Sequence, residues 1–305
     1  MKIANAPVSY GVFDLARDDT SLPGGEKLAR MVHEAGYQGI DLGAPGLLGE
    51  GQDLTKLLHR NSLGLAGGWV DLPFGAGTDE EFLVAFESAK QMMPLFIAGA
   101  EASNLPAPKP TLADKGDERR RNAPGGAKEL ELEDWQWDRF SDRLEKVAGM
   151  VRSFGLEPTF HHHASTYVET PSEIDRFLEV GDVDITFDSG HLLVGGGEPT
   201  TDIRRWASRI NHVHLKDADR SILRAAMNAQ DPMREIWANR VFVPLGQGDL
   251  DVDAMMDAIM ASGISTDADG WLVVEQDVIL QNEADVERAQ ADQIANREAL
   301  RRWIP

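Results

Sequence analysis

The amino-acid sequence predicts a single α/β domain folded as a (β/α)8 TIM barrel. Short apolar segments alternate along the chain with amphipathic segments of helical period, a pattern typical of parallel strands joined by helical crossovers. Polar motifs rich in histidine close several of the apolar segments, as in barrels whose active sites lie at the C-terminal strand ends. The alternative is an open doubly wound sheet, but no Gly-x-Gly-x-x-Gly turn follows the first apolar segment.

We expect residues 1–305 to form one domain, because no linker separates two halves. The expected strands, which are short and rich in apolar residues, are 3–9, 39–43, 64–70, 94–98, 156–162, 183–188, 210–215 and 271–276. The expected helices, which carry apolar residues at helical spacing, are 22–35, 51–62, 78–92, 134–154, 171–180, 200–208, 251–262 and 283–303.

One helix start can be predicted in chemical detail. Thr170 supplies an N-cap hydroxyl, Pro171 occupies the first helical position, and Glu173 completes a capping box. The preceding loop therefore ends at Thr170. This places residues 161–163 at the C-terminal end of a strand, with Glu169 in the loop beside them.

Two segments are too long to be plain connections. Residues 100–133 are rich in proline, glycine and charge, and residues 217–245 lengthen the connection between the seventh and eighth strands. Loops of this length in compact domains are often lids or binding loops, so we expect both on the C-terminal face as covers of the site. The run Arg119-Arg120-Arg121 has acidic neighbours and is interpreted as a solvated part of the first insertion.

Charge and composition exclude several classes of function. The chain has 30 Lys and Arg against 51 Asp and Glu, a net charge of −21, which disfavours nucleic-acid and anionic-membrane partners. It has no cysteine, so thiolate catalysis and cysteine-ligated metal sites are excluded. The sequence starts without the hydrophobic run of a signal peptide and has no long apolar stretch, so we expect a cytoplasmic protein.

Four polar clusters fall at the C-terminal ends of consecutive expected strands. They are His161-His162-His163, Asp188-Ser189-Gly190-His191, His212-Val213-His214-Leu215-Lys216-Asp217 and Glu275. Because side chains alternate along a strand and the outer face of a barrel is apolar, His212, His214 and Lys216 are expected to point inward. The same alternation turns Asp188 and Glu275 inward, close to imidazoles.

Buried carboxylates at a barrel mouth need a compensating cation, since each uncompensated charge costs several kcal/mol. Two carboxylates and one or two imidazoles form a mixed nitrogen and oxygen site suited to a divalent ion. Simpler interpretations remain for each cluster: His161-His162-His163 can be a fortuitous polar strand end, Asp188 can cap the next helix, Glu275 can pair with Lys216, and His212 can support the site without binding an ion.

These motifs resemble the xylose-isomerase-like sugar isomerase and epimerase superfamily, through Asp-x-x-His after the sixth strand, His-x-His on the seventh and Glu ending the eighth. Residues 161–170 and 212–217 look most like those of its inosose (2-keto-myo-inositol) dehydratase branch, and residues 7–11 and 243–248 also fit. The resemblance covers nearly the whole chain.

The resemblance implies one divalent ion on Asp188, His214 and Glu275. The epimerases place a Glu at the end of strand five, where this chain has His161, so His161, His163 or Glu169 is left to complete the ligand set. We expect His161, and Mn²⁺ before Co²⁺, Zn²⁺, Fe²⁺ or Mg²⁺. Arg220 matches an arginine that contacts substrate in the epimerases. We also expect Glu169, His212 and Trp69 to contact the substrate.

The shared step of the superfamily is proton removal next to a carbonyl. An imidazole in place of a carboxylate, with Lys216 on the inward face, favours a lyase that dehydrates a keto-polyol or keto-sugar, including a 3-keto-glycoside. His163, His191 and Lys216 are the expected catalytic residues, and a neighbouring cation is expected to lower the pKa of Lys216. The main alternative is a sugar or sugar-phosphate isomerase or 3-epimerase; a DNA-repair nuclease and an inactive barrel fit less well. Assembly into a homo-oligomer stays open.

Overall fold

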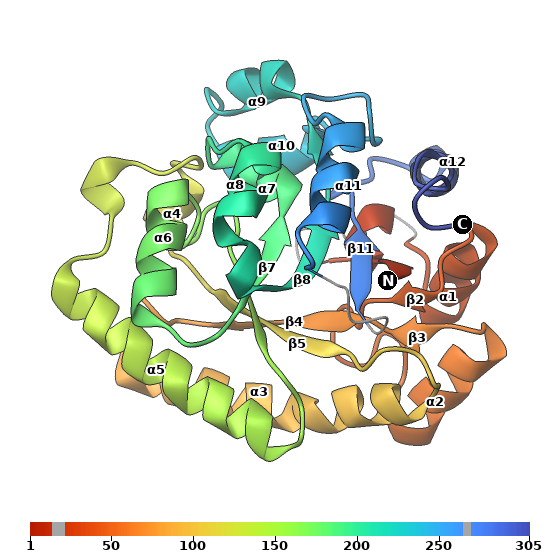
Figure 1. The fold of residues 1–305 in the computed structure, drawn as a ribbon, viewed down its shortest axis with the longest axis horizontal. Coiled ribbons are helices and arrows are strands. Elements are labelled where there is room, and N and C mark those ends of the chain that lie inside the picture. Colours follow the sequence, from red (N-terminus) through yellow and green to blue (C-terminus); the bar gives the residue numbers. More distant parts are fainter. Residues whose placement is uncertain (14–21, 265–269) are drawn as a thin grey trace.

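Parallel strands form the centre of the molecule, with helices around them (Figure 1). The structure is a computed structural model that describes residues 1–13, 22–264 and 270–305. Its main sheet has the strand order β3-β2-β1-β11-β8-β7-β6-β5-β4. Only Ala66 separates β3 (Gly64–Leu65) from β4 (Gly67–Leu72); β3 pairs with β2 and β4 pairs with β5, so these two pieces close the sheet. The prediction of a (β/α)8 barrel is confirmed.

The remaining barrel strands are β1 (Lys2–Asn5), β2 (Gly39–Ile40), β5 (Lys109–Asp114), β6 (Thr159–His161), β7 (Ile185–Asp188), β8 (Ile210–Leu215) and β11 (Trp271–Val274). The long helices are α1 (Gly25–Glu34), α2 (Gly51–Arg60), α3 (Asp79–Glu101), α5 (Asp134–Ser153), α6 (Pro171–Val180), α8 (Pro199–Trp206), α11 (Val252–Ala261) and α12 (Ala284–Ala299). The capping box predicted for Thr170 and Glu173 opens α6. No described helix is long and apolar enough to cross a bilayer.

The prediction of a strand at 94–98 is wrong. These residues belong to α3, where Met93, Leu95 and Phe96 are buried. The fourth barrel strand is β5, which lies inside the segment that the sequence analysis treats as an insertion. Periodicity cannot distinguish a short apolar run in a strand from one in a buried helix. Proline is unfavourable inside helices and strands, but here Pro94 lies inside the helix and Pro110 lies inside the strand, so both argued against the correct assignment.

Of the two expected insertions, 217–245 follows a C-terminal strand end, but only the part 115–133 of the segment 100–133 does so, because 102–108 lead into β5 and 109–114 form it. Residues 115–133 leave β5 and contain the single-turn helix α4 (Glu118–Arg121). Residues 217–245 leave β8 and contain α9 (Arg220–Ala226), α10 (Pro232–Ala238) and the antiparallel pair of β9 (Asp217–Ala218) and β10 (Phe242–Val243). The Asp217 carboxylate fastens this segment, because it accepts backbone hydrogen bonds from Gly246, Gly248 and Leu250.

The prediction that the run Arg119-Arg120-Arg121 is solvated is wrong for Arg120. Arg120 is fully buried, and its guanidinium lies 3.2 Å from Glu169 Oε2 and 2.9 Å from Glu173 Oε1. Glu169 Oε1 also accepts a hydrogen bond from the Gly125 backbone at 2.7 Å. This buried ion-pair cluster joins the segment after β5 to the start of α6.

Arg120→Ala should lower the free energy of unfolding by about 3 to 5 kcal/mol, because it leaves two buried carboxyl groups without their cation. Urea denaturation measures the loss. Arg121→Ala, which removes an exposed neighbour on the same helical turn, should change the stability by less than about 0.5 kcal/mol. Equal effects of the two substitutions would show that the buried cluster does not anchor this segment.

Candidate active site

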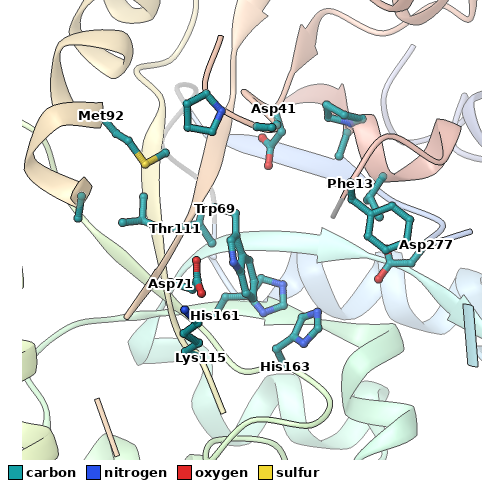
Figure 2. A pocket seen from close by; sticks show the side chains of 18 of the residues that line it. Phe13, Asp41, Trp69, Asp71, Met92, Thr111, Lys115, His161, His163 and Asp277 are labelled. Carbon is teal, nitrogen blue, oxygen red and sulfur yellow. The ribbon is translucent and has the colours of Figure 1, made fainter. Parts of the chain in front are cut away.

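A cavity of about 840 Å³ opens at the C-terminal end of the barrel (Figure 2). Its polar floor consists of residues from β6, β8 and the segment after β11: His161, His163, His214, Lys216, Glu275 and Asp277. Trp69 of β4 lies beside the two histidines, with its ring centroid 5.5 Å from that of His161 and 4.9 Å from that of His163. The predicted clusters from several strand ends therefore meet at one place.

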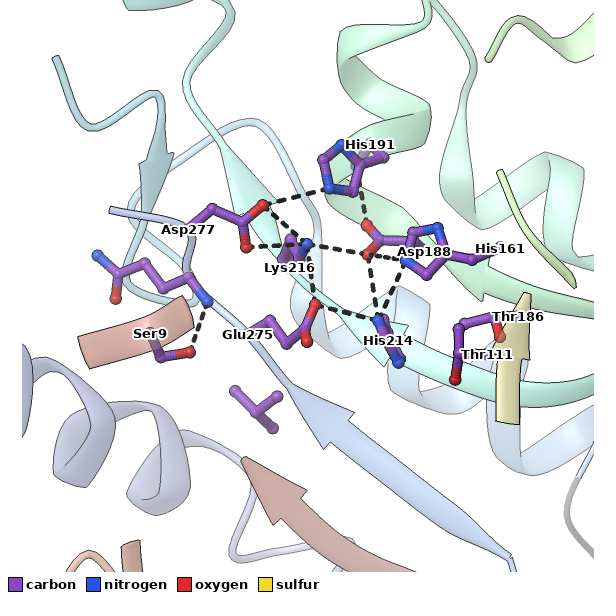
Figure 3. Close-up of polar contacts among 12 residues, drawn as sticks. Ser9, Thr111, His161, Thr186, Asp188, His191, His214, Lys216, Glu275 and Asp277 are labelled. Carbon is purple, nitrogen blue, oxygen red and sulfur yellow. Dashed lines mark hydrogen bonds and ion pairs between the residues drawn. The ribbon is translucent and has the colours of Figure 1, made fainter. Parts of the chain in front are cut away.

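Four side chains converge on one point of this floor (Figure 3). His161 Nε2 lies 3.3 Å from Asp188 Oδ2 and 3.2 Å from His214 Nδ1. His214 Nδ1 lies 3.0 Å from Glu275 Oε2 and 3.7 Å from Asp188 Oδ2. All four residues are buried, and one donor atom from each lies within 4.8 Å of the others. Among the alternatives on strand five, the structure brings His161 into this group.

The local backbone explains how these side chains are aimed. Asp188 ends β7 and caps α7 (Ser189–Val194), so its Oδ1 accepts a hydrogen bond from the His191 backbone at 2.8 Å and its Oδ2 faces the cluster. His214 pairs in register with Asp188 on one side and Val273 on the other. Because neighbours in register on parallel strands share a face, Asp188 and His214 both point inward.

The donor set fits a divalent cation. Metal–ligand bonds of about 2.1 Å place neighbouring ligand atoms about 3.0 to 3.4 Å apart in octahedral or tetrahedral shells. Three of the four measured separations, 3.0, 3.2 and 3.3 Å, lie in this range. A hydrogen bond between His161 and His214 uses the lone pair of only one imidazole, whereas a cation at the centre uses a lone pair from all four residues.

Lys216 lies next to this cluster. Its Nζ lies 3.2 Å from Asp188 Oδ2, 2.9 Å from Glu275 Oε2 and 2.9 Å from Asp277 Oδ1. Burial alone lowers the pKa of Lys216, but these three carboxyl groups outweigh burial and raise it. The protein groups alone therefore favour the ammonium form of Lys216, and the lowering expected from a bound cation stays a prediction. Three carboxylates and one ammonium give a formal charge of −2, which leaves room for a divalent ion.

A second group lies on the other side of Lys216. The rings of His163 and His191 lie 3.7 Å apart between centroids, and His191 Nε2 lies 3.2 Å from Asp277 Oδ2. The Ala164 backbone donates a hydrogen bond to His191 Nδ1, which assigns the proton of that ring to Nε2. His163 Nδ1 lies 2.8 Å from the Ala164 carbonyl and must donate to it, so His163 Nε2 is a free base. Burial lowers the pKa of both histidines.

His163 and His191 differ in access to the cavity. His163 lines the cavity, whereas His191 is fully buried and is not among the described lining residues. Asp277, which anchors His191, also accepts a hydrogen bond from Trp237 Nε1 at 3.1 Å. Of the two histidines, only His163 is therefore placed to touch a substrate.

Three of the residues expected to contact a substrate lie elsewhere. Glu169 is enclosed by Arg120 and Glu173, and burial raises its pKa to about 7. Arg220 opens α9 and donates to the Gly197 carbonyl, at the turn before α8. His212 is buried below His214, at 5.2 Å between ring centroids. None of the three is among the described residues that line the cavity, whereas Trp69 is.

Several residues of the site were not predicted from the sequence. Asp277 follows Glu275 by two positions, so the alternation that turns Glu275 inward was a usable signal for it. Asp41 follows β2 and lines the cavity, and burial raises its pKa to about 7. Lys115, directly after β5, was missed because the fourth strand was misplaced.

Comparisons with known proteins agree with this geometry. A family model described as xylose isomerase-like TIM barrel matches residues 29–296. The rhizopine catabolism protein MocC of Rhizobium meliloti is 30% identical over 280 residues, which are 90% of this chain and 81% of MocC. The inosose dehydratase of Geobacillus kaustophilus (strain HTA426) is 35% identical over 158 residues, which are 51% of this chain and 50% of that enzyme.

A solved structure shows the same fold over its full length. The crystal structure of the IOLI protein with a bound zinc atom covers 99% of this chain and 97% of its own, with a TM-score of 0.69 and 14% identity. The superfamily resemblance inferred from the motifs is thus confirmed by a match over most of the chain. The chain belongs to the xylose isomerase-like TIM-barrel family.

Proposed function

We propose that this protein is a metal-dependent dehydratase that acts on a keto-polyol or keto-sugar. The observation that carries the proposal is the convergence of His161, Asp188, His214 and Glu275 at the floor of the cavity, with the free base His163 beside them. The similarity to MocC and to an inosose dehydratase supports a small polyol substrate. The molecule that the protein binds is thus a small-molecule substrate.

We assign one divalent cation, Mn²⁺ in the first instance, to the four converging residues. When bound, it would polarise the substrate carbonyl and stabilise the negative charge of the enolate. The zinc of the IOLI protein supports a metal in this fold. His162 helps to hold Asp188 in position, because its Nε2 accepts a hydrogen bond from the Asp188 backbone at 3.1 Å.

The protein's own residues supply the proton transfers. His163 Nε2 takes the proton from the carbon next to the carbonyl, and the electron pair of that C–H bond moves toward the carbonyl oxygen, which becomes negative. When the carbonyl forms again, this electron pair makes the C=C bond to the β-carbon as the β-carbon–oxygen bond breaks. The protonated His163 gives its proton to the departing hydroxyl, which leaves as water. The Lys216 ammonium donates a hydrogen bond to the substrate oxygen that becomes negative. His191 and Asp277 hold His163 and Lys216 in position.

The direct test is incubation of the metal-loaded protein with a keto-inositol. Elimination should produce the absorbance of an α,β-unsaturated ketone together with a product lighter by one water, measured by mass spectrometry. An isomerase or 3-epimerase would instead return a product of unchanged mass, because no group leaves. A product of unchanged mass would overturn the dehydratase proposal and favour that alternative.

Asp188→Asn and Glu275→Gln should abolish metal retention, because each removes one anionic ligand from a buried cation site. Elemental analysis after gel filtration measures the bound metal, and circular dichroism checks that the barrel stays folded. Asp71→Asn, which changes a carboxyl group that lines the cavity outside the cluster, should retain the metal. Unchanged metal content in both ligand variants would contradict the assignment.

His163→Gln should lower kcat by about 10²- to 10⁴-fold, the usual contribution of a positioned acid–base group, while the metal content stays that of the wild type. It should also stop solvent deuterium exchange at the substrate carbon next to the carbonyl. His59→Gln, on the exposed side of α2, is the matched control and should leave both rates unchanged. Wild-type exchange in His163→Gln would contradict the assignment of His163 as the base.

A further inference from the structure

The cavity extends well beyond the residues that the proposed reaction uses. The same cavity is lined by Val84, Ala85 and Met92 of α3 and by Ala44 and Pro45 after β2. We call this part the α3 arm. In the view of Figure 2, Met92 and His163 lie on opposite sides of Trp69. The arm therefore continues the catalytic cavity past Trp69.

The spacing along α3 brings the apolar residues of the arm together. Val84, Ala85 and Met92 recur at helical spacing and share one face of the helix, where Glu81 and Ser88 lie beside them. The adjoining side of α3 buries Phe82, Met93 and Phe96 in the core. Val84 nevertheless stays 64% exposed, although it is an apolar side chain beside the entrance of a polar site. This surface is free to bind an apolar group.

The size of the cavity exceeds what a single polyol ring requires. Small-molecule sites of about 300 to 1,000 Å³ enclose drug-sized ligands, and this cavity of about 840 Å³ is near the upper end of that range. A monocyclic keto-polyol is smaller than such ligands and carries a hydroxyl or carbonyl group on each ring carbon. It would occupy the floor and leave the α3 arm empty.

The charges around the cavity disfavour an anionic substrate. Asp41, Asp71, Glu80 and Glu81 line it outside the floor, against the single lysine Lys115 among the described lining residues there. A phosphate group would meet a negative potential on this path, on a chain whose net charge is −21. The substrate that fits is uncharged.

We propose that the substrate is an uncharged keto-polyol or keto-sugar that carries an apolar substituent, and that this substituent binds in the α3 arm. The inference rests on the proposed function for the ketone end of the molecule, and it adds the chemistry of the other end. Val84, Ala85 and Met92 are the residues that determine this specificity. Trp69 lies between the two parts and packs against the ring.

The test uses calorimetric titration of the Mn²⁺-loaded protein with myo-inositol and with its phenyl ether. Because burial of a phenyl group removes a large apolar area from water, the wild type should bind the ether about tenfold or more tightly than myo-inositol. Val84→Glu and Ala85→Glu place a charge in the arm and should bring the two affinities within about twofold of each other. Affinity for myo-inositol itself should not change.

Leu83→Glu is the matched control. Leu83 is on the same helix and 49% exposed, but it is not among the described residues that line the cavity. This variant should keep the wild-type preference. Equal affinities in the wild type, or the same loss in Leu83→Glu, would overturn the proposal. So would a Val84→Glu protein that dissociates from an oligomer in sedimentation velocity while its preference for the ether stays unchanged.

The outcome is independent of the dehydratase test. Neither probe has a ketone, so their affinities do not depend on whether the protein eliminates water. A preference for the ether without dehydration of a keto-inositol would leave the α3 arm proposal standing and remove the proposed reaction. Dehydration without any preference would do the reverse.

Discussion

Lys216 holds its ammonium nitrogen within 3.2 Å of three carboxyl groups, those of Asp188, Glu275 and Asp277. The floor of the barrel depends on this arrangement, because a group of buried carboxylates needs a neighbouring cation, and loss of a buried partner costs about 3 to 5 kcal/mol. One ammonium does not neutralise three carboxylates. The remaining negative charge lies where His161 and His214 aim their nitrogens, and it gives the site its capacity for a divalent cation.

The barrel supplies this arrangement through strand ends. Asp188 and His214 are register partners on neighbouring strands, and Glu275 follows the strand that pairs with His214, so three elements far apart in sequence place polar atoms on one point. Buried carboxyl groups also lie beside a cation away from the cavity, where Arg120 pairs with Glu169 and Glu173. The Arg120 ion pairs anchor a segment of the C-terminal face, whereas the excess negative charge at the floor allows a divalent cation to bind.

Local patterns predicted the barrel and most of the floor. Alternation along the strands was enough to turn Asp188, His214, Lys216 and Glu275 inward, because the opposite face had to be apolar. Residues whose positions depend on tertiary partners could not be found in this way. In the sequence, Arg120 is one of three adjacent arginines, and only the fold shows that Glu169 and Glu173 enclose it. Arg220 was placed at the site by resemblance alone, and Glu169 by its position in the loop after residues 161–163. The fourth strand was misplaced because the apolar run 94–98 inside α3 resembles a strand, whereas β5 contains Lys109 and Pro110 and has no long apolar run.

The central claim is that one divalent cation binds where His161, Asp188, His214 and Glu275 converge. Anomalous diffraction from a crystal grown with Mn²⁺ locates the ion directly. The account predicts one strong anomalous peak within bonding distance of His161 Nε2, Asp188 Oδ2, His214 Nδ1 and Glu275 Oε2. No peak there, or a peak between His163, His191 and Asp277 instead, would contradict it.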